Sequence, residues 1–303
     1  MIVSRQGLLL LNKKPGATSF ESLSAVKKAF ATGKVGHTGT LDKFASGLLL
    51  VLVGRAVKLA PLFEKCAKEY TAALLFGAET DTLDPEGAII ATGKFPSRED
   101  VEAVLHSFRG AIFQSPPAYS AVHIGGRRAH ELAREGKTPE MKKRPVTVFA
   151  LEILRWEPPE AVIHVRCSSG TYIRSLARDI ALAAGSRAHL IALERTRIGD
   201  FCLDDAVNGD DAKIVNALRQ LDRKFFEALS LPYFFLDSEA ENGFLHGKSL
   251  ETLLPARCFT DAEAAGIFRE SEKDELLGVI MRKDSKWVYG HVFGGNQLLP
   301  ISV

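Results

Sequence analysis

The segment Gly36-His37-Thr38-Gly39-Thr40-Leu41-Asp42, followed by Ser46-Gly47 and the apolar run from Leu48 to Val53, is the most informative part of this chain. Its glycines and threonines allow the backbone to turn sharply and to approach a ligand closely. One carboxylate, Asp42, stands at the end of this loop against a hydrophobic segment that we predict to be a buried strand. This setting suits a positioned nucleophile or base, but a β-turn capped by Asp42 accounts for the spacing equally well.

Outside this loop, the hydrophobic pattern predicts a domain that mixes strands and helices. Apolar residues alternate with polar or smaller ones from Tyr70 to Phe76, which is typical of a half-buried strand. Thr18 and Glu21 form a capping-box pattern ahead of an amphipathic helix that extends to Phe30. Strands and helices follow one another irregularly, and several strands have hairpin connections, so we predict an α+β fold with a mixed, mainly antiparallel sheet and flanking helices. The other predicted elements are strands at 7–12, 146–156, 161–167 and 189–198 and helices at 55–63, 97–109, 171–184 and 210–221.

The segment Ser230-Leu231-Pro232 is the predicted boundary between two domains. Residues 1–230 form the larger predicted domain, and residues 231–303 form a small β-rich module. Charge is distributed unevenly, because residues 1–150 hold 21 Lys and Arg against 14 Asp and Glu, whereas residues 231–303 hold 7 against 11. We therefore expect the larger domain to hold any polyanionic ligand.

The composition disfavours several classes of protein. The chain has 303 residues, 46% of them hydrophobic, and a net charge of +2, which is ordinary for a globular protein. It contains no apolar run near the ~18 residues of a membrane span and no signal-peptide core, so we expect a cytoplasmic protein without membrane contact. Its four cysteines are far apart, so we expect reduced thiols and no metal site. It lacks the glycine-rich loops that bind nucleotide cofactors.

Five segments, in order along the chain, carry a resemblance to one family. They are residues 12–19 (NKKPGATS), the loop that ends at Asp42, residues 68–70 (KEY) with the later 80–87 (TDTLDPEG), residues 114–123 (QSPPAYSAVH) and residues 167–174 (CSSGTYIR). Each match is weak alone, but their order and spacing together resemble the TruB family of tRNA pseudouridine synthases. Two positions depart from the family pattern, since Lys14 stands where proline is usual and His123 where lysine is common.

The resemblance implies the pseudouridine synthase fold with a PUA-like module at the C-terminal end. It also implies isomerisation of the uridine at position 55 in the T loop of tRNA, with the target base flipped out of its stack. In that reaction the bond between N1 and C1′ breaks and C1′ is rejoined to C5, so no redox step or group donor takes part and no cofactor is expected. The expected partner is the T stem-loop of tRNA, without an obligate protein partner.

Three residues form the predicted catalytic group. The resemblance makes Asp42 the essential residue; an ionised carboxylate can attack the base, attack the sugar carbon or remove a sugar proton, and the sequence leaves all three routes open. A carboxylate beside an apolar wall tends to lose its charge unless a cation is near, and Arg174 is the expected bidentate partner. In the family, the tyrosine that matches Tyr70 stacks on the target base. Outside that context, Arg174 is typical of a surface helix and Tyr70 of a core.

The predicted RNA-binding residues are one histidine, one tyrosine and a set of basic side chains. The family places the histidine that matches His37 in the RNA stack, where it fills space left by flipped nucleotides. The lysines and arginines are candidates for phosphate contacts, although each alone is typical of a solvated surface charge. The predicted set is His37, Lys13, Lys28, Lys34, Tyr172, Arg127, Arg128 and Lys143.

The sequence leaves three alternative functions open. A guided synthase of the dyskerin type is the nearest, but that type normally carries long basic tails and lacks the helical insertion predicted at 79–144. A non-catalytic RNA-binding or RNA-folding protein is disfavoured by the intact Asp42, Tyr70 and Arg174. A carboxylate glycosidase would need a second acid about 5–10 Å from the first, and no acid near Asp42 has a comparable setting in the sequence.

Overall fold

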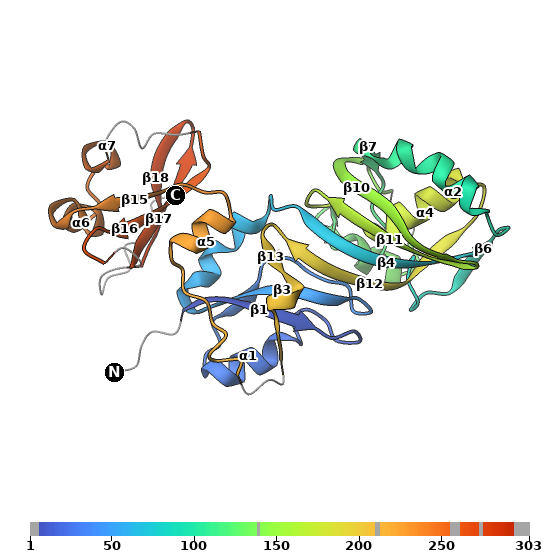
Figure 1. Ribbon diagram of the computed structural model, residues 1–303, viewed down its shortest axis with the longest axis horizontal. Coiled ribbons are helices and arrows are strands. Elements are labelled where there is room, and N and C mark those ends of the chain that lie inside the picture. Colours follow the sequence, from blue (N-terminus) through green and yellow to red (C-terminus); the bar gives the residue numbers. More distant parts are fainter. Residues whose placement is uncertain (1–5, 138–139, 210–212, 255–260, 273–274, 294–303) are drawn as a thin grey trace.

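The fold is taken from a computed structural model, which describes residues 6–137, 140–209, 213–254, 261–272 and 275–293. Its main element is a ten-stranded sheet (Figure 1). In spatial order the strands are β14 (Val207–Asn208), β1 (Gly7–Lys13), β3 (Ser46–Val53), β12 (Ala188–Ile198), β4 (Lys68–Phe76), β11 (Glu160–Cys167), β10 (Arg144–Glu157) and β7 (Gly110–Gln114), with β2 (Val35–His37) beside β3 and β13 (Phe201–Cys202) beside β12. The β14–β1 and β3–β12 pairings are parallel and the others antiparallel, which confirms the predicted fold class.

A second, four-stranded sheet follows the main sheet in the chain, and helices and short hairpins accompany the two sheets. The helices are α1 (Leu23–Phe30), α2 (Arg98–Leu105), α3 (Ala129–Arg134), α4 (Ile173–Ala183), α5 (Arg223–Ala228), α6 (Ser238–Leu245), α7 (Leu250–Leu253) and the 3-10 helices η1 (Gly54–Phe63), η2 (His106–Phe108) and η3 (Leu203–Asp205). The hairpins are β5 (Ala78–Thr80) with β6 (Ile89–Thr92) and β8 (His123–Ile124) with β9 (Arg127–Arg128). The second sheet contains β15 (Tyr233–Leu236), β16 (Ala264–Arg269), β17 (Leu276–Lys283) and β18 (Lys286–Val292).

Helices α2 and α4 cover one face of the part of the main sheet that contains β4, β11 and β10 (Figure 1). Leu105 of α2 and Leu176 and Ile180 of α4 pack in one apolar cluster with Ala72 and Tyr70 of β4. The alternation of buried and half-buried residues along β4 is the one that the sequence predicts. This packing places the beginning of α4 near the Asp42 loop, which we define as residues 38–45.

The first predicted helix starts later than its capping signal. Thr18 N donates to Glu21 Oε2 at 2.7 Å, and Glu21 N donates to Thr18 Oγ1 at 3.1 Å, so the reciprocal bonds of a capping box are present. Regular α-helix begins only at Leu23, because residues 19–22 form turns before it.

The predicted helix at 210–221 is wrong over its described residues, since residues 213–217 are turns and residues 210–212 lie outside the described part. The backbone of Arg219 instead pairs with Leu8 at the start of β1, with N–O distances of 2.8 and 3.0 Å. This bridge requires an extended backbone at Arg219, so a helix cannot continue through this residue to 221.

The second sheet shares an apolar core with the main sheet. Phe226 of α5 and Phe268 of β16 are both fully buried, and their rings meet edge to face with centroids 5.5 Å apart. Gly266 permits this contact, because a Cβ there would lie 2.9 Å from the Phe226 ring. The same cluster contains Leu50 of β3. The division at residue 230 remains a prediction, but these contacts lead us to expect one cooperative folding unit.

We expect Phe268→Ala to lower the free energy of unfolding of the whole chain by about 3–5 kcal/mol, because it leaves a cavity in this shared core. Differential scanning calorimetry should record a single transition at a lower temperature. Val288→Ala, at a position in β18 that is 37% exposed, is the control and should change stability by less than about 1 kcal/mol. Two separate transitions in the unaltered protein would contradict the shared core.

Candidate active site

The Asp42 loop connects β2 to β3 and is hydrogen-bonded to the segment that precedes α1. Leu41 N donates to Ser19 Oγ at 2.8 Å, and Ser19 Oγ donates to Leu41 O at 3.1 Å. Asp42 O accepts a hydrogen bond from Ala45 N at 3.2 Å, which completes the turn into β3. The Asp42 side chain is 37% exposed, so a ligand can reach its oxygen atoms.

Lys13, at the end of β1, supports this loop with a buried ammonium group. The residue is 1% exposed, and Nζ donates to the backbone oxygens of Ala45 at 2.5 Å, Lys14 at 3.1 Å and Lys43 at 3.3 Å. Burial lowers the pKa of Lys13 to about 8, although the Asp42 carboxylate opposes this shift. The prediction that Lys13 contacts RNA is therefore wrong, because its three donors are used inside the protein.

Arg195 of β12 holds the same loop, and the sequence analysis did not identify it. The residue is 1% exposed. Its Nε donates to Leu48 O at 2.8 Å, its Nη2 to Gly39 O at 3.1 Å and its Nη1 to Thr40 O at 3.4 Å. These bonds and those of Lys13 fix the backbone on both sides of Asp42, so the loop is pre-organised without a ligand.

Arg174, in the first turn of α4, connects three loops. Its Nε lies 2.9 Å from Asp42 Oδ2 and its Nη2 donates to Asp42 Oδ1 at 3.0 Å, so the guanidinium faces both carboxylate oxygens. The expected contact between Arg174 and Asp42 is present as one hydrogen bond, from Nη2, and one ion-pair contact, from Nε, which makes no hydrogen bond. Nη2 also donates to Tyr119 O at 3.0 Å, and Nη1 donates to Thr82 O at 2.7 Å and to Asp84 Oδ2 at 3.2 Å. Arg174 is 4% exposed, so these contacts lie away from solvent.

A second carboxylate, that of Asp84, contacts the same guanidinium, although the sequence analysis found no comparable acid near Asp42. Its Oδ1 accepts from Thr82 Oγ1 at 2.6 Å and from Glu86 N at 3.1 Å, and its side chain is 9% exposed. Burial raises the pKa of Asp42, the positive charge of Arg174 opposes this rise, and the negative charge of Asp84 adds to it. Arg174 is thus the main group that favours the ionised form of Asp42.

Tyr70 packs beside the Asp42 loop, in the apolar cluster that includes Leu41 and Ala45. It is 7% exposed. Burial raises the pKa of the Tyr70 hydroxyl, while Arg195 opposes this shift. Tyr70 therefore keeps its proton at neutral pH, which makes it a hydrogen-bond donor and an uncharged ring beside the site.

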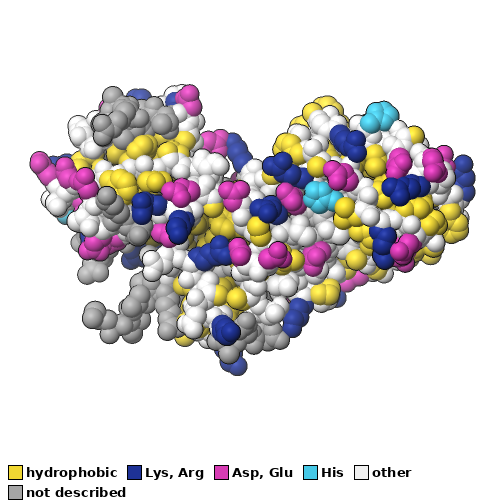
Figure 2. All heavy atoms as spheres, in the orientation of Figure 1, with side chains coloured by type: hydrophobic (Ala, Val, Ile, Leu, Met, Phe, Trp, Pro, Cys, Tyr) yellow, Lys and Arg dark blue, Asp and Glu magenta, His cyan; other side chains and the backbone are white. Residues whose placement is uncertain are grey.

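The other predicted RNA-binding residues are half-buried or exposed. His37, at the end of β2, is half-buried, and burial lowers the pKa of its imidazole, so the ring is neutral at pH 7. Tyr172 is held ahead of α4 by two bonds between its backbone and the Gln114 amide, at 2.8 and 3.0 Å. Figure 2 shows basic and acidic side chains intermixed over one face of the molecule. The exposed basic residues of the predicted set are Lys28, Lys34, Arg127, Arg128 and Lys143.

Among the residues that the structure describes, no group of three or more His, Cys, Asp and Glu side chains is placed to hold a metal ion. No helix in those residues is long and apolar enough to cross a membrane. Cys66, Cys167 and Cys202 are free thiols, and Cys258 lies outside the described residues.

Comparison with solved structures defines the class of protein. The chain resembles one in the crystal structure of a Cbf5-Nop10-Gar1 complex, with a TM-score of 0.66 and 25% identity over 91% of this chain and 78% of that chain. It also resembles one in the archaeal box H/ACA sRNP Nop10-Cbf5 complex, with a TM-score of 0.63 and 23% identity over 92% and 79% of the two chains. The fold is therefore that of the pseudouridine synthases.

Comparison of sequences identifies the family. Residues 27–173 match the model of the TruB family pseudouridylate synthase N-terminal domain. The tRNA pseudouridine synthase B of Borreliella burgdorferi (strain ZS7) is 44% identical over 277 residues, which cover 90% of this chain and 94% of that protein. That of Treponema denticola is 37% identical over 306 residues, covering 83% and 86%. The chain belongs to the TruB family of pseudouridylate synthases.

Proposed function

We propose that this protein converts uridine 55 in the T loop of tRNA to pseudouridine and that Asp42 is the catalytic carboxylate. The contact of both Asp42 oxygens with the guanidinium of Arg174, in a loop that is fixed before a substrate binds, carries this proposal. Its relatives named tRNA pseudouridine synthase B support tRNA as the substrate.

Asp42 acts in this proposal as an ionised group beside the uridine. Cleavage of the N1–C1′ bond begins with attack of the carboxylate on the base, attack on C1′, or removal of a sugar proton, and each of these steps requires the ionised form. The Arg174 guanidinium favours that form against the effect of burial, and it also orients the carboxylate because it faces both oxygens. The partial exposure of Asp42 leaves room for a base that has been flipped out of the RNA stack.

Tyr70 and Asp84 have supporting roles in the same proposal. The Tyr70 ring borders the site as a surface on which the flipped uracil stacks, and its protonated hydroxyl is suited to exchange of the C5 proton. Asp84 is not a second catalytic acid of the glycosidase kind, because one oxygen accepts from Thr82 and Glu86 and the other faces Arg174. It holds Arg174 in place for Asp42.

We further propose that the T arm is held mainly by residues 1–230, where the basic residues are concentrated. His37 fills space in the RNA stack, and Tyr172, the N-cap residue of α4, lies two residues before Arg174 in the chain. The proposed phosphate contacts are those of Lys28, Lys34, Arg127, Arg128 and Lys143, which are all exposed.

Incubation with unmodified tRNA that is tritiated at C5 of uracil tests this proposal. We expect release of one equivalent of tritium per tRNA, because C5 loses its hydrogen when it is joined to C1′. A transcript with cytidine at position 55 is the matched control and should release none above background. Equal release from both transcripts would contradict the assignment of position 55, and no release from the transcript with uridine at position 55 would contradict the activity.

A further inference from the structure

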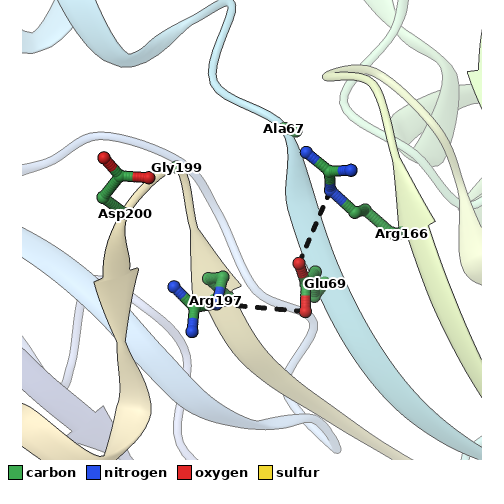
Figure 3. Close-up of a pocket in the computed structure, with 6 residues that line it drawn as sticks. All are labelled: Ala67, Glu69, Arg166, Arg197, Gly199 and Asp200. Atoms are coloured by element: carbon green, nitrogen blue, oxygen red, sulfur yellow. Dashed lines mark ion pairs between the residues drawn. The ribbon is translucent and has the colours of Figure 1, made fainter. Parts of the chain in front are cut away.

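A hollow outside the candidate active site lies on the face of the main sheet that Glu69 occupies (Figure 3). Glu69 and Tyr70 are consecutive in β4, so their side chains face opposite sides of the sheet. Tyr70 packs with α4, whereas Glu69 faces a hollow of about 320 Å³ on the other side. The residues that line this hollow are Ala67, Glu69, Arg166, Arg197, Gly199 and Asp200.

Two arginines flank Glu69 in a row across three strands. The pairing registers place Arg166 of β11 and Arg197 of β12 directly beside Glu69. Arg166 Nε lies 3.5 Å from Glu69 Oε1, and Arg197 Nε lies 4.0 Å from Glu69 Oε2. His164 Nε2 also lies 3.5 Å from Glu69 Oε2. Figure 3 shows the two guanidinium groups approaching the carboxylate from its two sides.

The contact recorded between each guanidinium and Glu69 is made through Nε. In the described part of the chain, neither the Arg166 nor the Arg197 side chain has a hydrogen bond, and Glu69 is the only ion-pair partner of each. The two side chains are 53% and 42% exposed. Glu69 thus holds two guanidinium groups beside the hollow. Their terminal N–H groups are available to donate hydrogen bonds to an oxyanion.

An exposed aromatic ring extends this row. The guanidinium of Arg166 lies over the ring of Phe149 in β10, at 5.4 Å from the centroid. Phe149 is 51% exposed, although a phenyl ring of this size is normally buried. Guanidinium groups and aromatic rings at one exposed surface are characteristic of contacts with nucleic acid, where arginine binds phosphate and rings stack on bases.

We propose that Arg166 and Arg197 form a phosphate-binding site for a part of the tRNA outside the T stem-loop. This inference rests on the proposed function, because it takes tRNA as the substrate. A T stem-loop whose uridine contacts Asp42 lies on the Asp42 side of the sheet, whereas this row faces the opposite side. The phosphate that reaches Arg166 and Arg197 therefore belongs to another segment of the same RNA.

The first test is the double variant Arg166→Gln and Arg197→Gln, which keeps a donor near Glu69 but removes both charges. At roughly 0.1 M salt we expect about tenfold weaker binding of full-length tRNA, and the slope of log K against log salt concentration should decrease by about 2. Binding of the isolated T stem-loop and turnover on it should be unchanged. Arg155→Gln is the control, since Arg155 lies on β10 and pairs with Glu157 at 3.2 Å outside the hollow.

Glu69→Gln is the second test, because a phosphate site and a purely structural ion cluster predict different results. Removal of the negative charge should tighten binding of full-length tRNA about two- to fivefold while both arginines remain. Equal affinity for full-length tRNA in all variants, with lowered melting temperatures, would overturn the proposal in favour of a structural cluster. If the arginine double variant lost as much affinity for the isolated T stem-loop as for full-length tRNA, the proposed contact outside the T stem-loop would be overturned. Binding is measured independently of tritium release, so failure of the proposed activity is recorded separately.

Discussion

Asp42→Asn is expected to abolish pseudouridine formation, with turnover reduced on the order of ten-thousand-fold or more. Asparagine has nearly the same shape as aspartate but carries no charge, so it cannot serve as nucleophile or base. Affinity for tRNA should stay within a few-fold, because phosphate contacts provide most of the binding free energy. Single-turnover tritium release and a filter-binding assay measure the two quantities on the same preparation.

Asp179→Asn is the matched control for this prediction, since Asp179 lies in α4, contacts only Arg178 among the described ion pairs and is 29% exposed. Its turnover should be unchanged. Substantial turnover by Asp42→Asn would remove Asp42 from the chemistry, and a large loss of tRNA affinity would show that the carboxylate has a role in binding.

Arg174→Lys is expected to lower turnover by about a hundredfold with little change in tRNA binding. Lysine keeps the charge but loses the planar fork that faces both Asp42 oxygens at 2.9 and 3.0 Å. Arg174→Met should reduce turnover further and should also change its pH dependence. Near-normal turnover in the lysine variant would exclude the bidentate contact as a requirement, and normal turnover in the methionine variant would exclude Arg174 from the site.

The direction of the pH effect follows from the charges around Asp42. Burial already raises its pKa and Arg174 opposes that rise, so Arg174→Met should raise the pKa further. Turnover requires the ionised form and increases as pH rises through this pKa, so its acid limb should move to higher pH. Asp84→Asn removes a negative charge and should move the limb to lower pH. A shift in the same direction for both variants would contradict this account.

The sequence predicted most of the fold and the central residues of the candidate site. The alternating pattern of β4 produces the sheet face that places Tyr70 near the Asp42 loop, and the helical pattern of α4 places Arg174 there. The sequence is sufficient for these two elements because the hydrophobic pattern of each agrees with the side of it that is buried. Asp84 was missed because its approach to Arg174 depends on contact between segments 90 residues apart.

Lys13 and Arg195 show where a sequence pattern is insufficient. Lys13 has the residue type of a phosphate contact, and only the packing reveals that its ammonium group is enclosed. Arg195 and Arg197 are two residues apart in a strand, so regular alternation predicts that both face the same side. A bulge between them breaks this alternation, with Arg195 beside Tyr70 and Arg197 beside Glu69. One arginine therefore holds the Asp42 loop and the other lines the hollow.

The hydrogen bonds of Arg195 also determine when the site can form during synthesis. They join it to Leu48, Thr40 and Gly39, which precede it in the chain by 147, 155 and 156 residues. A nascent chain thus carries Asp42 long before it contains the arginine that fixes the backbone on either side of it. Because domains generally fold as units as they leave the ribosome, we expect the loop to acquire its complete set of hydrogen bonds when β12 has joined the sheet. We therefore expect competence for catalysis to arise late in translation, after most of the main sheet has been made.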